Sequence, residues 1–170
     1  SEDDTPNPIN IYGKSKFLGE QLVAENCDNY IIIRTNFYGL EKEGNFFFNW
    51  ILKNLRSNNE IVGFDDIIFT PLEVRNLSQL LNELISKDFV GILNLSSDEQ
   101  ISKFQFAMHV AEILNLNKDL IKKGYSSDMN FIARRPKDTS LSNKKAKKML
   151  NTKIIPLSQW LTNNKQLVKF

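Results

Sequence analysis

The stretch Tyr30-Ile31-Ile32-Ile33-Arg34 decides the fold class. A continuous run of β-branched residues is typical of a parallel strand that is covered on both faces. The preceding residues 12–26 are rich in Lys, Leu, Glu and Ala and predict a helix, with Leu18, Leu22 and Val23 on its buried side. A helix that leads into a buried strand is the repeating unit of an α/β sheet.

A second helix and strand follow in the same order further along the chain. Apolar residues recur with the spacing of an amphipathic helix at Leu77, Leu80, Leu81, Leu84 and Ile85. The apolar run Gly91-Ile92-Leu93-Asn94-Leu95 then predicts a strand, which we expect to lie beside residues 30–34 in a Rossmann-like sheet. Two strong strands are too few for an independent doubly wound domain, so we expect the missing strands to lie upstream of Ser1.

Shorter elements are expected in the remaining segments. The pattern predicts a helix over 46–55, a strand over 60–64, a helix over 102–114 that Ser102 and Gln105 open with a capping box, and a helix that Ser142 caps and that runs through Leu150.

Composition limits the classes of function. The 170 residues are 41% hydrophobic and 25% charged, which is typical of a soluble globular protein. The net charge of +2 gives no surplus for a nucleic acid or an anionic membrane, and no apolar run is long enough to cross a bilayer. The lone Cys27 has no disulfide partner and no zinc-binding spacing, so we expect a cytoplasmic protein without a metal site. The acidic start without methionine indicates a loop from the middle of a longer protein.

Tyr12 and Lys16 stand four residues apart in the first predicted helix, which places both side chains on one face. An ammonium near a phenol favours the phenolate, so such a pair suits proton exchange with a substrate oxygen near neutral pH. The spacing is common in helices, and most such pairs are solvated. Its surroundings therefore decide the interpretation.

Those surroundings carry a family resemblance that spans almost the whole chain. The first segment resembles the active-site segment of dTDP-4-dehydrorhamnose reductases, which belong to the extended short-chain dehydrogenase/reductase family. The similar positions are Glu2-x-Asp4-x-Pro6-x-Pro8-x-Asn10-x-Tyr12-Gly13-x-Ser15-Lys16-x-x-Gly19-Glu20, then Ile33-Arg34-Thr35-Asn36-x-Tyr38-Gly39, Phe69-Thr70-Pro71 and Arg135-Pro136-x-Asp138-x-x-Leu141-Ser142.

The resemblance implies NAD(P)-dependent reduction of a nucleotide-linked 4-keto-6-deoxy sugar, in the synthesis of nucleotide sugars and cell-surface polysaccharides. It implies that Tyr12 is the acid that protonates the sugar C4 oxygen. Lys16 would bind the nicotinamide ribose and lower the pKa of Tyr12. The Ser or Thr that completes the family's catalytic set lies upstream of the Tyr in the family and is absent here, and Ser15 is not its equivalent.

Three further residues are candidates for binding. Thr35 and Asn36 follow the carboxyl end of a parallel strand, where open α/β sheets bind ligands, so they either line the cofactor and substrate crevice or form a strand-ending turn. Arg135 carries a guanidinium that suits the substrate's diphosphate. Arg134 could serve instead, or neither.

The resemblance also divides the chain. We expect residues 1–41 and 72–101 to be the last helices and strands of a Rossmann-like domain whose N-terminal part is absent, and residues 42–71 and 102–170 to form the nucleotide-sugar-binding lobe. The seven glycines include no dinucleotide fingerprint, so the isolated chain should be inactive and should bind NADP or NAD weakly.

An uncovered sheet edge would favour a homodimer or docking of the missing N-terminal segment. Two other functions stay open: a nucleotide-sugar epimerase or dehydratase, and a non-catalytic binding subunit similar to the regulatory beta subunit of methionine adenosyltransferase. The Phe-Thr-Pro and Arg-Pro-x-Asp patterns favour the reductases.

Overall fold

Two parallel strands stand at the centre of the half of the molecule that carries the Tyr12 and Lys16 motif. The computed structural model describes residues 1–40, 46–166 and 168. Strands β1 (Ile31–Thr35) and β6 (Gly91–Leu95) pair in parallel along their whole length, with Ile31 opposite Gly91 and Thr35 opposite Leu95. The prediction that these two runs are neighbouring strands of an α/β fold is confirmed.

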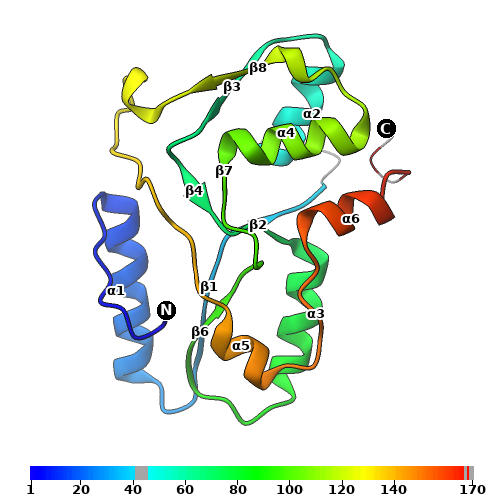
Figure 1. Ribbon diagram of the computed structural model, residues 1–170. Helices are drawn as coiled ribbons and strands as arrows, with labels where there is room; N and C mark the ends of the chain where they lie inside the picture. Colours follow the sequence, from blue (N-terminus) through cyan, green and yellow to red (C-terminus); the bar gives the residue numbers. More distant parts are fainter. Residues whose placement is uncertain (41–45, 167, 169–170) are drawn as a thin grey trace.

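Helices lie on both sides of this strand pair. Helix α1 (Ile11–Asn26) lies on one side, and α3 (Val74–Ile85) and α5 (Lys144–Met149) lie on the other (Figure 1). The side of α3 and α5 is tightly packed. It forms a cluster of buried residues that comprises Leu72, Leu77, Leu80, Leu84, Leu93, Leu95, Ala146 and Leu150.

The prediction of a buried side on α1 is wrong. Leu18, Leu22 and Val23 are 55%, 51% and 40% exposed, and no residue of α1 is buried. The partly covered positions are Gly13, Phe17 and Glu20, whose spacing places them on one face of the helix. That face turns toward β1, and the leucines lie on other faces.

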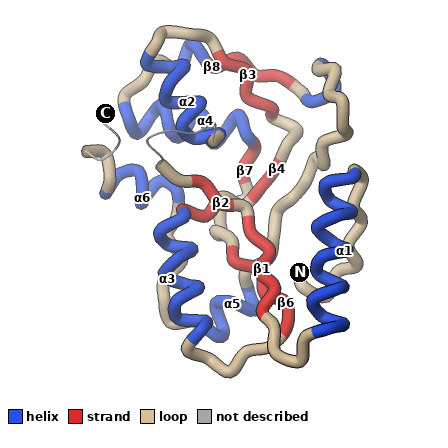
Figure 2. The backbone as a smooth tube through the Cα atoms, turned by 180° about the vertical axis from the view of Figure 1, so that it is seen from behind, coloured by secondary structure: helices blue, strands red, loops and turns tan. Residues whose placement is uncertain are grey.

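The other half of the molecule has its own parallel strand pair and a larger core. Strand β3 (Ile61–Phe64) pairs with β8 (Ile121–Gly124), and helices α2 (Phe47–Arg56) and α4 (Lys103–Leu114) lie next to the pair (Figure 2). Helix α6 (Leu157–Asn163) packs against α4. Rings of Tyr38, Phe48, Phe106 and Trp160 meet in the core at centroid distances of 5.3 to 6.3 Å.

Short strands join the two halves. They are β2 (Phe37–Tyr38) with β5 (Leu72–Glu73) in parallel and β4 (Ile68–Phe69) with β7 (Ile101–Ser102) antiparallel, and two 3-10 turns cover Lys118–Leu120 and Ser126–Asp128. The expected division into two domains stays a prediction, and its boundary between residues 41 and 42 lies outside the described residues. Among the described residues, no helix is both long and apolar enough to cross a membrane.

Of the two helix caps that the sequence predicted, one is correct and one is wrong. Ser102 and Gln105 form the predicted capping box: the Gln105 N–H donates to Ser102 Oγ at 3.0 Å, and the Ser102 N–H donates to Gln105 Oε1 at 2.8 Å. Ser142 does not cap α5. The N-cap position falls on Asn143, whose side chain donates to the Ser96 carbonyl and to Asp98 and so ties the helix start to the end of β6 instead.

Candidate active site

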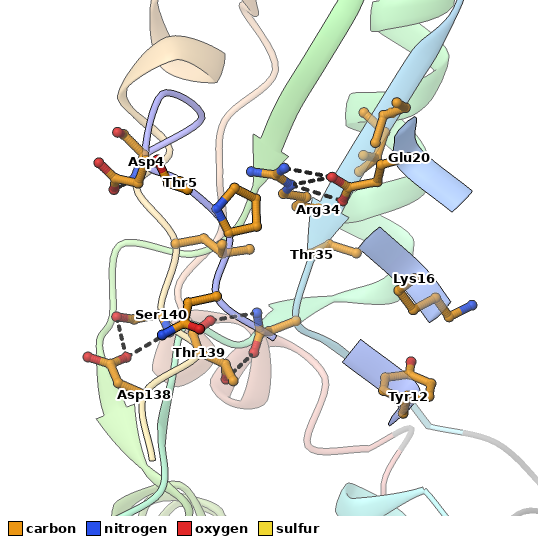
Figure 3. Close-up of a pocket in the computed structure, with 17 residues that line it drawn as sticks. Asp4, Thr5, Tyr12, Lys16, Glu20, Arg34, Thr35, Asp138, Thr139 and Ser140 are labelled. Atoms are coloured by element: carbon orange, nitrogen blue, oxygen red, sulfur yellow. Dashed lines mark hydrogen bonds and ion pairs between the residues drawn. The ribbon is translucent and has the colours of Figure 1, made fainter. Parts of the chain in front are cut away.

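A cavity of about 790 Å³ opens between α1, β1, the N-terminal residues 1–7 and the segment 138–141 (Figure 3). Four of the five side chains that the sequence proposed for the site line it, namely Tyr12, Lys16, Thr35 and Asn36. The fifth, Arg135, does not. The structure thus brings together one helix face, one strand end and one distant segment.

Tyr12 and Lys16 lie on successive turns at the start of α1. The helix begins where the Gly13 N–H donates to Asn10 Oδ1 at 2.8 Å, which satisfies one of the free N–H groups of the first turn. The Lys16 ammonium lies 5.7 Å from the centroid of the Tyr12 ring, and Tyr12 is 71% exposed. The pair is therefore close together and open to a ligand in the cavity.

Ser15 belongs to the same turn, but its hydroxyl is engaged locally. Ser15 Oγ donates to the carbonyl oxygen of Tyr12 at 2.9 Å. This bond is a contact within the helix, and it leaves the phenol of Tyr12 untouched.

Thr35, the last residue of β1, lines the cavity and has a buried hydroxyl. Its Oγ1 is buried and has no hydrogen-bond partner among the residues that the structure describes. A buried hydroxyl without a partner carries a free-energy penalty of about 1–3 kcal/mol, which a bound ligand can remove. Thr35 lines the cavity, but its Oγ1 exposes less than 1 Å² of surface, so a ligand reaches this hydroxyl only if the side chain turns.

Asn36 has a different role in the structure. Its Nδ2 donates to the Thr139 carbonyl at 3.1 Å, and its Oδ1 accepts from Thr139 Oγ1 at 3.0 Å. Both ends of the amide thus hold the segment 138–141 against the end of β1. Asn36 shapes the cavity wall, and these bonds use one of its two amide N–H donors and one of the two lone pairs of Oδ1.

Sequence reasoning missed Thr139 and gave Asp138 no role. The Thr139 N–H donates to the Ile68 carbonyl at 3.0 Å, so the segment is fastened to β4 as well as to Asn36. Asp138 Oδ1 accepts from the Ser140 N–H at 2.8 Å and from Ser140 Oγ at 2.6 Å, which shapes the turn. The available signal was the Arg-Pro-x-Asp-x-x-Leu-Ser pattern, which marked the segment but not the contacts.

An ion pair closes the third side of the cavity. Glu20 of α1 accepts from Arg34 of β1, with Nη2 to Oε2 at 2.6 Å and Nε to Oε1 at 2.9 Å. The side chains of Glu20 and Arg34 are 21% and 18% exposed. Hydrogen bonding to Glu20 raises the pKa of Arg34, so the guanidinium stays charged.

The two arginines considered for the diphosphate lie outside the cavity. The Arg135 guanidinium carbon is 5.4 Å from the centroid of the Phe131 ring, and the residue is exposed. Arg134 takes part through its backbone, whose carbonyl accepts from Asn10 Nδ2 at 2.9 Å. A diphosphate clamp by Arg135 stays a prediction.

The described residues fit one end of a dinucleotide cofactor. Tyr12, Lys16 and the unpaired Thr35 hydroxyl offer donors and acceptors to a nicotinamide ribose. The pyrophosphate end needs backbone N–H groups at the start of a helix that follows a glycine turn. Gly91 is the one described glycine with positive φ, and it lies in strand β6 and not before a helix. Within residues 1–40, 46–166 and 168, no three His, Cys, Asp or Glu side chains gather as a metal site.

A comparison with known protein families identifies the family of this chain. The model of the RmlD substrate binding domain matches residues 1–169. The chain belongs to this family. Its motifs around Tyr12, Thr35 and Arg135 all fall inside the match.

Known proteins agree with this family assignment. A dTDP-4-dehydrorhamnose reductase from Bacillus anthracis, solved in complex with NADP, superposes with a TM-score of 0.85 at 28% identity, over 98% of this chain and 58% of that one. The chain is 26% identical to the probable low-salt glycan biosynthesis reductase Agl14 of Haloferax volcanii, over 82% of this chain and 48% of that protein.

A third relative is named as a subunit of another enzyme and not as a reductase. The chain is 27% identical to methionine adenosyltransferase 2 subunit beta of Rattus norvegicus, over 83% of this chain and 44% of that protein. The chain spans about half the length of the relatives it matches. The prediction of a Rossmann-like α/β fold, shared with the reductases, is confirmed.

Proposed function

We propose that this chain supplies the acid/base pair and the sugar-nucleotide side of an NAD(P)-dependent reductase. The substrate is a 4-keto-6-deoxy sugar on a nucleoside diphosphate, and dTDP-4-dehydrorhamnose is the first compound to test. One observation carries the proposal. Tyr12 and Lys16 lie on one face of α1, at a cavity that also holds the buried, unpaired hydroxyl of Thr35.

The reaction assigns a role to each of these groups. NAD(P)H, when bound, supplies the hydride that reduces the carbonyl carbon at C4. Tyr12 donates its phenolic proton to the C4 oxygen, so the C=O group becomes CH–OH and a phenolate remains. The Lys16 ammonium stabilises that phenolate until solvent returns a proton. Thr35 Oγ1 hydrogen-bonds the ligand, and Asn36 holds the cavity wall in place.

The relatives support this function from two directions. One is named as a dTDP-4-dehydrorhamnose reductase in complex with NADP, and another as a probable reductase of glycan biosynthesis. We place the reaction in the cytoplasm, because the single exposed Cys27 suits a reducing compartment. The pyrophosphate of the cofactor would be held by residues upstream of Ser1, and the isolated chain would be inactive.

A binding subunit is the second candidate. It is favoured by the 27% identity to methionine adenosyltransferase 2 subunit beta, which is similar to the 26% identity to Agl14 and the 28% identity to the Bacillus anthracis reductase. In that case the cavity would bind a nucleotide without turning over a sugar. An epimerase or dehydratase is the third, since such enzymes use the same Tyr and Lys pair.

Two reactions separate the three functions. In the first, the full-length gene product is mixed with NADPH and dTDP-4-dehydrorhamnose, and a reductase consumes one NADPH for each sugar reduced. An epimerase or dehydratase begins by oxidising a C4 hydroxyl, which this ketone lacks, so the second reaction offers NAD+ with dTDP-glucose or a UDP-sugar, and such an enzyme converts that sugar without net formation of NADH. A binding subunit is inactive in both reactions. The last two results would overturn the proposed function. Ser15→Ala should give the same result as the parent in these reactions, because the Ser15 hydroxyl donates to the Tyr12 carbonyl within the helix.

A further inference from the structure

Helix α1 carries the proposed catalytic pair yet buries none of its residues. Within the described residues, Asn10 and Glu20 each join this helix to a distant segment of the chain. We propose that Asn10 and Glu20 are positioning residues, which fix α1 so that Tyr12 and Lys16 face the cavity. The expected effect of Asn10 and Glu20 on catalysis rests on the proposed function. Their effect on the position of α1 does not depend on it.

Asn10 fixes the start of the helix through both ends of its amide. Its Oδ1 accepts from the Gly13 N–H at 2.8 Å, and its Nδ2 donates to the Arg134 carbonyl at 2.9 Å. One side chain thus caps the helix and ties it to a segment 124 residues away. Tyr12 follows two positions later, so a shift of this link moves the phenol directly.

Gly13 leaves the space that this arrangement needs. A Cβ at position 13 would lie 3.3 Å from Asn10 Oδ1 and 3.1 Å from Pro8 Cβ. Both distances are tighter than ordinary van der Waals contact, so a side chain there would push Asn10 and Pro8 away from the first turn. The absence of a side chain at Gly13 therefore leaves room for the Asn10 side chain to bond the first turn of α1.

Glu20 fixes the helix one turn after Lys16. Its carboxylate receives two parallel hydrogen bonds from the Arg34 guanidinium, a geometry that sets orientation as well as distance. Arg34 immediately precedes Thr35, so the ion pair aligns α1 with the strand residue that carries the unpaired hydroxyl. With Asn10 at one end and Glu20 further along, the rotation of α1 about its axis is fixed at two points.

The first test measures α1 directly and needs no activity. Asn10→Asp keeps an oxygen for the Gly13 N–H but has no N–H to give Arg134, and Glu20→Gln keeps the shape but removes the charge. Glu25→Gln is the control, because Glu25 lies exposed on the same helix. We expect hydrogen exchange of α1 amides in the chain to speed up roughly three- to tenfold in the first two variants, with α4 unchanged. Unchanged α1 exchange in folded Asn10→Asp and Glu20→Gln would overturn the proposal.

The second test detects a displacement of Tyr12 and Lys16 through the kinetics of the full-length gene product. Asn10→Asp and Glu20→Gln should lower kcat about tenfold with little change in KM, and should shift the pH profile of kcat, because the phenol and ammonium are displaced. A variant that only lost stability would keep the parental pH profile. If the parent shows no turnover, the proposed function fails while the exchange result still decides the links. If the parent turns over and both variants keep its kcat and pH profile, the positioning role is refuted.

Discussion

Lys103 is a half-buried cation, and we predict that replacing it with methionine stabilises the protein. It is the first residue of α4, and its ammonium lies 3.3 Å from the centroid of the Phe69 ring and 4.7 Å from that of Phe47. Burial lowers the pKa of Lys103 from 10.5 to about 8. The ammonium therefore loses hydration in the folded state and gains two aromatic faces in return.

The two effects can be compared in size. At about 1.4 kcal/mol per pKa unit, this depression corresponds to roughly 3 kcal/mol against the folded protein at neutral pH. The ring faces offset about 1–2 kcal/mol of that penalty. Methionine keeps the unbranched shape and a favourable sulfur–aromatic contact without a charge. Lys103→Met should therefore raise the free energy of unfolding by about 1–2 kcal/mol at neutral pH.

The pH dependence gives the prediction its sign. The pKa of the lysine is about 8 in the folded protein and 10.5 in the unfolded chain, so between these values the unfolded chain binds more protons. The parent protein therefore gains stability as pH rises through this window, while Lys103→Met gains none from this site. The advantage of the variant is full below the folded pKa and shrinks toward pH about 10.

Urea unfolding at neutral pH and at pH about 10 measures both parts of the prediction. Lys148→Met is the control, because Lys148 is an exposed lysine of α5, and its effect should stay within about 0.5 kcal/mol. The reasoning is refuted if Lys103→Met is less stable than the parent at neutral pH. It is refuted equally if the difference between them does not change with pH.

Three further predictions concern stability. Glu83 accepts from two backbone N–H groups just after α5, which lower its pKa to about 2, so the parent should lose stability as pH falls from about 4.5 to about 2. Glu83→Gln should melt lower at neutral pH and lack that dependence, and equal melting curves for the two proteins would contradict this. Phe106 is fully buried in the aromatic core, so Phe106→Ala should lower the free energy of unfolding by about 3–5 kcal/mol in urea, and a loss below about 1 kcal/mol would show that the core is loosely packed there. A Cβ on Gly63 would lie 2.7 Å from the backbone of Phe104, whereas one on Gly19 would meet nothing within 4 Å. Gly63→Ala should therefore destabilise the protein and Gly19→Ala stabilise it by up to about 1 kcal/mol, and the reverse order in urea unfolding would count against the packing described for β3.

Local patterns account for the parts of the fold that the sequence predicted correctly. The apolar runs of β1 and β6 and the periodic leucines of α3 are signals that lie within a single element, and the structure has all three. The capping box of Ser102 and Gln105 is equally local. Each of these predictions needed no knowledge of a distant segment.

Distant contacts account for what the sequence could not predict. Asn10 bonds a carbonyl 124 residues away, and Asn36 bonds a residue 103 away, so no local pattern reveals either link. The leucines of α1 have the composition of a buried face, but composition does not say which face meets β1. Asn36 was expected either to line the crevice or to form a strand-ending turn. It lines the cavity, and its bonds to Thr139 were not considered from the sequence.

The most direct test of the central claim is the turnover of Tyr12→Phe in the full-length gene product, with NADPH and dTDP-4-dehydrorhamnose as substrates. Tyr12 is 71% exposed, and Tyr12→Phe removes only the hydroxyl group. Folding should therefore be unaffected, and the circular dichroism spectrum should match that of the parent. If Tyr12 donates the proton to the sugar oxygen, kcat falls by roughly two orders of magnitude or more. Turnover at the parental level would remove Tyr12 from the mechanism and contradict the role proposed for this site.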